Sequence, residues 1–421
     1  MESGKQLTTR QLWANRLAPA ALWCLPALTL TLPKGLLPFG LLFLASSLMV
    51  PGTILAAARQ FPRQVGVLAA VAVFALGVAV VSGLMLGLEP GELDSRDRLL
   101  FLPWAAAWTV ALAPPRRMLW WGAVWGVSLA ALLAVVQVLG GAARASGWGN
   151  AIVFADVVVV LMVLVALCRP PGHGRLMMLV LGLGLLTLLL SGTRGTWPGA
   201  VLVVALATLG CGWRSRRRRV GLLAALLVGA CALVAAVPGL TERMRLSELQ
   251  NDIARIESGD HDSSAGARWE RLHVAARAFA DKPWTGVGFG HFDLAMRQQL
   301  PACRQHEPPL RCHLGHAHND LAEWAATMGL PGALALLALY GAPLLLFWRL
   351  RRRLPRPGLH DSATVGMVMV VVFAMCGLTQ SMFAHQTTTA IYAALTGILM
   401  GLALRESRAS GLRPSGAPQA R

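Results

Sequence analysis

The sequence predicts an all-α polytopic membrane protein. Hydrophobic residues make up 55% of the 421 positions and charged residues only 14%, whereas soluble domains carry about 25% charged residues. The apolar residues are collected in blocks, and most of these approach the roughly 20 residues that a helix needs to cross a bilayer. The net charge of +18 is the third observation, because its distribution along the chain indicates an orientation.

Twelve apolar blocks are candidate spans, which predicts a bundle of about 12 transmembrane helices. They lie at 17–32, 35–56, 65–88, 99–113, 118–140, 151–168, 176–190, 196–212, 220–237, 331–348, 363–382 and 386–404. No small-residue cleavage site follows the first block, so we expect an uncleaved first span. The expected divisions are an N-terminal bundle of about nine helices (1–237), a periplasmic loop domain (238–330), C-terminal helices (331–404) and a cytoplasmic tail (405–421).

The basic residues obey the positive-inside rule if the N-terminus is cytoplasmic. The cytoplasmic segments then contain 23 of the 38 Lys and Arg residues but only three acids. The whole positive excess therefore lies on one side of the membrane. Anionic lipid suffices as its partner, and a nucleic-acid partner is not indicated. Both termini are expected in the cytoplasm, and the charged outer segment 89–98 is interpreted as a solvated turn.

Arg194 lies between two apolar blocks in a Ser-Gly-Thr-Arg-Gly-Thr turn. One interpretation is an interfacial anchor whose guanidinium reaches the lipid head groups. The other is a phosphate cradle, because the small neighbours let the backbone approach a ligand and the turn offers N–H donors beside one guanidinium.

The segment 267–281 has Trp269, Leu272, Ala276 and Phe279 at helical spacing. Arg268 and Arg271 lie three residues apart on this predicted helix and are therefore close together on its surface. A solvated basic face is the favoured interpretation of Arg271. The glycines of the following Gly-x-Gly-x-Gly, 286–290, lack the strand–turn–helix context of a dinucleotide site and are expected to shape a tight loop.

A histidine-rich segment, 316–323, begins a helix that is predicted to end at Gly329. Asp320 and Glu323 have capping-box spacing, with Asp320 in the Ser/Thr role. His318 would then lie just before the helix N-terminus. The positive end of the helix dipole disfavours imidazolium there, and a neutral ring suits a general base.

Metal binding is the competing interpretation of the histidines. His306, His313, His316 and His318 cluster in the sequence, but their spacing matches no familiar zinc pattern. The pair Asp260 and Asp262 could hold a divalent ion, although its Ser- and Gly-rich surroundings favour a solvated loop. No metal site is predicted.

Cys303 and Cys312 lie nine residues apart in the long polar stretch, with two prolines between them. If this stretch faces an oxidising compartment, a disulfide between them is expected.

These motifs together resemble the bacterial O-antigen ligase and polymerase family of inner-membrane glycosyltransferases. The resemblance rests on the arginine in a small-residue turn, Arg-x-x-x-Leu (268–272), Pro-x-x-Gly-x-Gly-x-Gly (283–290), and His-x-His-Asn (316–319) before a Gly-Leu-Pro-Gly helix end. The motif-bearing part covers about 190–335. Modest length and a compact late loop resemble the ligase more than the polymerase.

The resemblance implies a class C glycosyltransferase that transfers O-antigen from undecaprenyl diphosphate to the lipid A-core oligosaccharide at the periplasmic face. It implies that His318 is the catalytic histidine and that Arg194 and Arg268 lie at the diphosphate. Arg271, His316 and Asn319 complete the expected substrate-binding set. Arginines can neutralise a diphosphate leaving group without metal, so we expect an inverting displacement with no cofactor.

Three alternatives remain at this point. An O-antigen polymerase and a protein O-oligosaccharyltransferase belong to the same family. A multi-span lipid or drug transporter is the alternative from another class, but it would be marked by internal repeats and mid-membrane ionisable residues. The chain shows no repeat, and Asp156 is the only acid inside the candidate spans.

Overall fold

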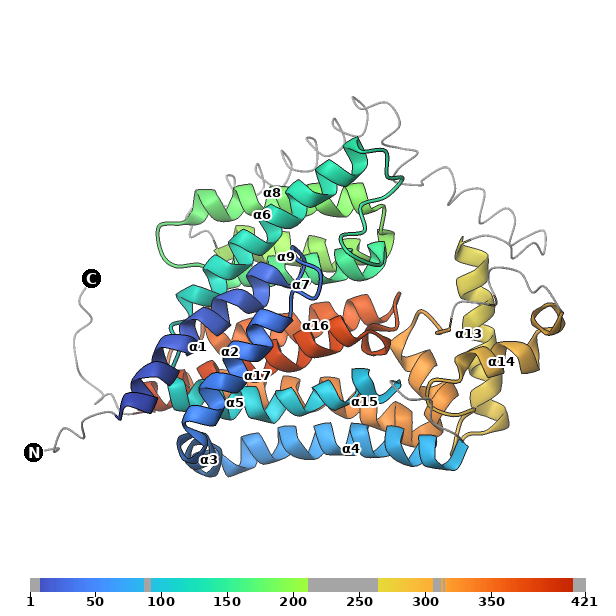
Figure 1. Ribbon diagram of the computed structural model, residues 1–421, viewed down its shortest axis with the longest axis horizontal. Helices are drawn as coiled ribbons and strands as arrows, with labels where there is room; N and C mark the ends of the chain where they lie inside the picture. The colour runs from blue at the N-terminus through green and yellow to red at the C-terminus, as the bar shows by residue number, and fades with distance from the viewer. Residues whose placement is uncertain (1–7, 87–91, 211–263, 306–311, 313–314, 412–421) are drawn as a thin grey trace, which may run out of the picture.

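The computed structural model describes residues 8–86, 92–210, 264–305, 312 and 315–411 (Figure 1). The described residues form helices joined by turns, with no strand among them, which confirms the all-α class. The bundle consists of α1 (Thr9–Leu28), α2 (Leu37–Met49), α3 (Pro51–Gln60), α4 (Pro62–Leu86), α5 (Phe101–Leu112), α6 (Arg117–Leu139), α7 (Ala151–Leu167), α8 (Gly174–Ser191), α9 (Trp197–Gly210), α15 (Asp320–Arg352), α16 (Ser362–Gly377) and α17 (Gln386–Gly411).

The bundle helices coincide with apolar blocks of the sequence. Block 220–237 lies outside the described residues. In the part that the structure describes, five helices are long and apolar enough to span a membrane, or six if α2 and α3 form one span. That pair is bent by 88° at Val50, because Pro51 disfavours the helical conformation of the residue before it. The protein is therefore a polytopic membrane protein, and the number of about 12 spans stays a prediction.

Hydrogen bonds between helix ends show which of these ends lie together at each end of the bundle. At one end they join Arg405 to Val110 (3.0 Å), Arg116 to Leu167 (2.9 Å) and Ser362 to Glu406 (2.6 Å). At the opposite end they join Thr193 to Ala151 (3.3 Å), Asn319 to Leu378 (3.0 Å) and Arg98 to Gln386 (3.1 Å). We call this second end the loop end, because α13 (Ser264–Asp281) and α14 (Phe292–Gln299) lie beside it (Figure 1).

The glycine-rich turn after α13 attaches this helix to α15. Backbone N–H groups of Val287 and Gly288 donate to carbonyl oxygens of Ala326 and Thr327, each at 2.9 Å. Gly286 has φ 64°, and a Cβ there would lie 2.3 Å from the backbone carbon of Thr327. The expectation that these glycines shape a tight loop is therefore confirmed.

Helix α15 contains a break at Gly329, where the backbone adopts φ 63° and ψ −155°. The first part of α15 therefore ends where the sequence predicts, and a second helical part follows without a connecting loop. The N-cap is Asn319, whose side chain accepts from the backbone N–H of Ala322 at 2.9 Å. The assignment of Asp320 to this role is wrong, because its buried carboxyl instead accepts from the hydroxyl of Tyr340 at 2.8 Å.

Helix α13 forms as predicted but buries a different face. Trp269 and Leu272 of the expected apolar stripe are exposed, whereas Val274, Ala275 and Ala278 pack into a small core with α14. This core contains the Cys303–Cys312 disulfide, whose Cα atoms lie 5.5 Å apart. The buried face is fixed by the contact with α15, which helical spacing alone does not reveal.

Gly286→Ala is expected to lower the free energy of unfolding by about 2 kcal/mol or more, since a left-handed backbone penalises a Cβ and the added atom overlaps α15. Thermal unfolding of the detergent-purified protein measures this as a lower Tm. Gly182→Ala in α8 is the matched control, because a Cβ there has nothing within 4 Å. Equal melting temperatures for the two variants would contradict the role assigned to the turn.

Candidate active site

His318 lies at the loop end, immediately before the N-cap of α15. Its backbone has φ 54°, a left-handed conformation that costs most residues about 1–2 kcal/mol. The loop is held by Glu323, whose Oε2 accepts from the backbone N–H of Ala317 at 2.5 Å. The His318 side chain is buried, with 8% of the residue exposed. Strain of this kind persists where the surrounding contacts determine the conformation, and it is frequent at functional sites.

Gln380, between α16 and η6 (Met382–Ala384), fixes the proton position on the His318 ring. Its Oε1 lies 2.7 Å from His318 Nδ1 and accepts the backbone N–H of Ser381 at 3.1 Å. Because that N–H can only donate, the amide atom facing it is the oxygen, which can only accept. Nδ1 of His318 therefore carries the proton, and Nε2 carries the lone pair that a base requires.

Two further histidines adjoin this pair. The Gln380 amide group donates to Nε2 of His385 across 3.2 Å, which places the proton of a neutral His385 on Nδ1. The His316 ring centroid lies 4.3 Å from that of His318 and 5.3 Å from that of His385. The three rings are thus packed together, and close packing disfavours a charge on any of them.

The pKa values of these histidines are lowered. Burial is the main cause, and it lowers the pKa of His318 to about 3, helped by the charges of His316, Arg268 and Arg271. Burial and His385 lower the pKa of His316 to about 4. His318 is therefore neutral at physiological pH. The helix dipole also predicts a neutral His318 from the sequence. In the structure, burial is the larger cause of its lowered pKa.

Arg268 and Arg271 approach His318 from α13. Arg271 is 1% exposed, so its interpretation as part of a solvated face is wrong. Burial lowers the pKa of Arg271 to about 10, and Arg268 adds to this, but at neutral pH the guanidinium remains protonated. Glu270 and Glu323 oppose this lowering at Arg271. The two guanidinium groups nevertheless place positive charge beside a neutral imidazole.

Arg194 opens η3 (Arg194–Thr196), a turn that packs against the Gln380 segment. A Cβ on Gly195 would lie 2.2 Å from Oγ1 of Thr379, so only glycine allows this approach. Arg144 braces the turn, donating to the carbonyl of Ser191 at 2.7 Å. The structure thus brings the Arg194 turn to the segment that orients His318.

A model of the family described as O-antigen ligase matches residues 178–337. This segment contains Arg194, Arg268 and His318. Over these residues the chain is similar to the O-antigen ligase family. An uncharacterized protein of Haemophilus influenzae is 25% identical over 217 residues, which cover 50% of this chain and 52% of that protein. The chain thus spans about half the length of this curated relative.

Some candidate residues take structural roles or lie outside the described residues. Asn319 caps α15, and its amide group donates to the carbonyl of Leu378 at 3.0 Å. His306, His313, Asp260 and Asp262 lie outside the described residues. Among the residues that the structure describes, no three His, Cys, Asp or Glu side chains are grouped to hold a metal.

Three polar residues at the site were not assigned a role from the sequence. Gln380 and His385 lie at the ends of the last two apolar blocks, and the polar run 379–381 inside an apolar block was the available signal. Arg96 is buried, donates to the carbonyl of Phe383, and lies 4.3 Å from the ring centroid of Trp324. The described part of the predicted solvated turn, 92–98, is therefore not simply solvated.

The Gln380–His318 hydrogen bond predicts a measurable tautomer. In ¹⁵N NMR of the labelled protein, His318 should be neutral with Nε2 unprotonated from pH 5 to 8, because its folded pKa lies near 3. Gln380→Glu adds a carboxylate that stabilises imidazolium and should raise this pKa by at least about one unit. Gln380→Leu is the uncharged control and should mix the two tautomers. A protonated Nε2 in the parent protein would contradict the assignment.

Proposed function

We propose that this chain is an O-antigen ligase that transfers O-antigen from undecaprenyl diphosphate to the lipid A-core oligosaccharide at the periplasmic face of the inner membrane. The observation that carries the proposal is the Nε2 lone pair of His318, fixed by Gln380 and accompanied by Arg268 and Arg271. A hydroxyl acceptor needs a base, and a diphosphate donor needs positive charge. Both requirements fit the O-antigen ligase family, whose model matches residues 178–337.

The proposed reaction is one inverting displacement. Nε2 of His318 takes the proton of the acceptor hydroxyl while that oxygen attacks the anomeric carbon of the donor sugar. The bond between this carbon and the diphosphate oxygen breaks, and the electron pair leaves with the diphosphate. Arg194 and Arg268 stabilise the charge on the leaving group, and Arg271 supports them from the buried face of α13. The proton on His318 then passes to water.

Donor binding should make His318 a stronger base. In the free protein, burial and the positive charges of Arg268 and Arg271 hold its pKa near 3, well below the range that suits a general base at neutral pH. A bound diphosphate places negative charge beside the same arginines and favours imidazolium, so the pKa of His318 rises. The site thus gains basic strength when the leaving group is in place.

The proposed orientation follows from the two ends of the bundle. His318, Arg194 and the helices α13 and α14 occupy the loop end. The opposite end carries Arg116 and the arginines that close α15. Since Lys and Arg accumulate on the cytoplasmic side, the loop end is assigned to the periplasm and both termini to the cytoplasm. The domain boundaries at 237, 330 and 404 are retained as part of this proposal.

Expression in a ligase-null strain tests the transfer reaction. The parent protein should restore polymer-capped lipopolysaccharide on gels, and His318→Ala should abolish it at equal membrane abundance, because the acceptor hydroxyl loses its base. Arg277→Ala is the matched control, since Arg277 is exposed on the same α13 helix. Restoration of polymer length in a polymerase-null strain, without capping in the ligase-null strain, would contradict the ligase assignment and support a polymerase.

Transfer by purified protein separates the roles of base and arginines. His318→Ala should lose on the order of 10²–10⁴ in turnover while still binding undecaprenyl diphosphate. Arg194→Ala and Arg268→Ala should weaken that binding about tenfold or more, since each removes a charge-assisted contact. Lysine should not fully replace either arginine, because it lacks the bidentate fork.

The same assay in excess EDTA decides whether metal is needed, and transfer should persist. Loss of activity that Mg²⁺ or Mn²⁺ restores would contradict the arginine-only account and would direct attention to Asp260 and Asp262. Unchanged donor binding in both arginine variants would contradict their proposed contact with the diphosphate.

A further inference from the structure

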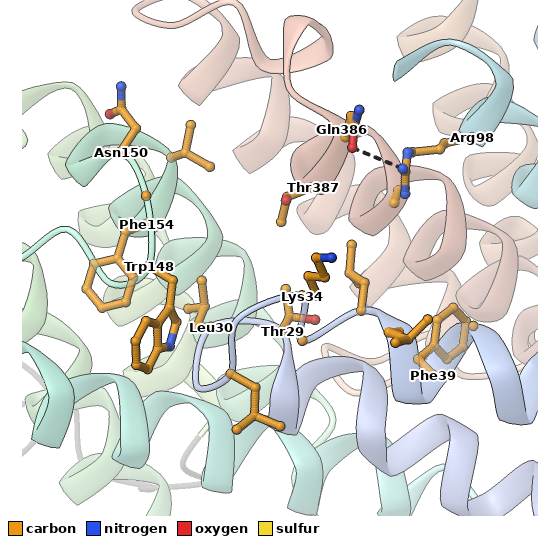
Figure 2. A pocket seen from close by; sticks show the side chains of 18 of the residues that line it. Thr29, Leu30, Lys34, Phe39, Arg98, Trp148, Asn150, Phe154, Gln386 and Thr387 are labelled. Atoms are coloured by element: carbon orange, nitrogen blue, oxygen red, sulfur yellow. Dashed lines mark hydrogen bonds between the residues drawn. The ribbon is translucent and has the colours of Figure 1, made fainter. Parts of the chain in front are cut away.

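A cavity of about 580 Å³ lies at the loop end, and His316, His318 and His385 are not among its lining residues. Its lining comes from the α1–α2 connection, η2 (Asp97–Leu100), the 146–150 turn and the first turn of α17. Figure 2 shows Lys34 near the middle, with Trp148 on one side and Arg98 with Gln386 on the other. The volume is large enough for a sugar or lipid head group.

The charged groups of the lining are of one sign. Lys34 and Arg98 line the cavity, and among the residues that the structure describes no Asp or Glu belongs to the lining. Arg98 keeps a hydrogen bond to Gln386 at 3.1 Å, which holds its guanidinium at the wall. The helices α7 and α17 also begin at this wall, so the positive ends of two helix dipoles add to the field. The cavity therefore favours an anionic group such as phosphate.

Lys34 is presented by a turn that the fold holds tightly. Its backbone has φ 57°, in the left-handed region that favours glycine. A Cβ on the neighbouring Gly35 would lie 1.9 Å from the carbonyl oxygen of Leu28, so the turn is pressed against the end of α1. An exposed lysine in a strained, closely packed turn is typical of a functional position.

The rest of the lining suits a glycolipid. Apolar side chains form much of the wall, including Leu30, Phe39 and Phe154. Trp148 is 59% exposed and offers a ring face on which a sugar can stack. Asn150 and Thr387 add polar atoms that can contact hydroxyl groups. A ligand with phosphate, sugar and acyl parts matches all three kinds of surface.

The cavity adjoins the histidine cluster on two sides. Gln386 follows His385, which accepts a hydrogen bond from Gln380. On the other side, the carbonyl of Ala151 accepts from Oγ1 of Thr193, the residue before Arg194. A ligand anchored in the cavity therefore lies beside both segments that form the proposed reaction centre, as an acceptor must.

We propose that the cavity lined by Lys34, Arg98 and Trp148 binds the phosphorylated glycolipid acceptor, with its phosphate at the two cations. This inference rests on the proposed transferase function, which requires two amphiphilic substrates at once. The arginines near His318 serve the diphosphate of the donor. The separate pair of cations at the cavity serves the second anion.

Kinetics and binding of Lys34→Gln and Arg98→Gln test the assignment. Each should raise the acceptor KM about tenfold, the loss expected for one charge-assisted contact, and leave the donor KM within about twofold. Lys34→Arg keeps the charge and should retain most of the affinity. Arg59→Gln is the matched control, since Arg59 is exposed on α3 away from the cavity.

Binding is measured separately by native mass spectrometry without donor, using core lipopolysaccharide lacking O-antigen, its phosphatase-treated form and phosphatidylglycerol. The parent should prefer the phosphorylated glycolipid, and Lys34→Gln should lose that preference. If this preference is found but no transfer occurs, the proposed function fails while the cavity assignment stands. Transfer with unchanged acceptor KM and binding in both variants would overturn the cavity assignment alone. The cavity assignment would also be overturned if the variants lost only the binding of phosphatidylglycerol, or if they raised the donor KM.

Discussion

The hydrogen bond between His318 and Gln380 is the contact on which the arrangement of the site depends. Gln380 is fully buried and its oxygen accepts from both the imidazole and the backbone of Ser381, so the amide has one allowed orientation. A buried acceptor without a donor costs about 1–3 kcal/mol, which favours keeping His318 in place. Because Gln380 follows α16 and His318 precedes α15, this bond also couples the histidine loop to the packing of the bundle.

The electrostatics of the loop end follow from burying positive charge beside neutral rings. Arg271 and Arg96 are both buried, and burial lowers the pKa of each to about 10. Asp320 and Glu323 partly oppose this at Arg96. Arg96, between η1 (Glu92–Ser95) and η2, contacts η6 through the carbonyl of Phe383 and the start of α15 through the Trp324 ring. Arginine suits such a position because its planar, weakly hydrated guanidinium can both donate and stack.

Local sequence signals predicted the helices but not the partners of their polar residues. Apolar block length located the bundle helices, and Gly329 correctly marked the break in α15, since glycine tolerates φ > 0. The burial of Arg271 and the role of Gln380 were not predictable in this way, because each depends on a helix distant in sequence. The N-cap is Asn319 rather than the predicted Asp320 for the same reason, because the Asp320 carboxyl accepts a hydrogen bond from Tyr340. The roles of His318, Arg194 and Arg268 came from motif resemblance and stay proposals.

The lowered pKa of His318 has a consequence for the order of events. In an empty site the imidazole holds a proton only weakly, so it activates neither water nor a stray hydroxyl efficiently. In the proposed reaction, a diphosphate beside Arg268 and Arg271 offsets the two charges that add to the effect of burial on His318, so the pKa of His318 rises. In this proposal, His318 becomes a stronger base only when the leaving group is bound. A buried neutral histidine held by an uncharged glutamine permits this dependence, whereas a carboxylate partner would keep the imidazole basic even without donor.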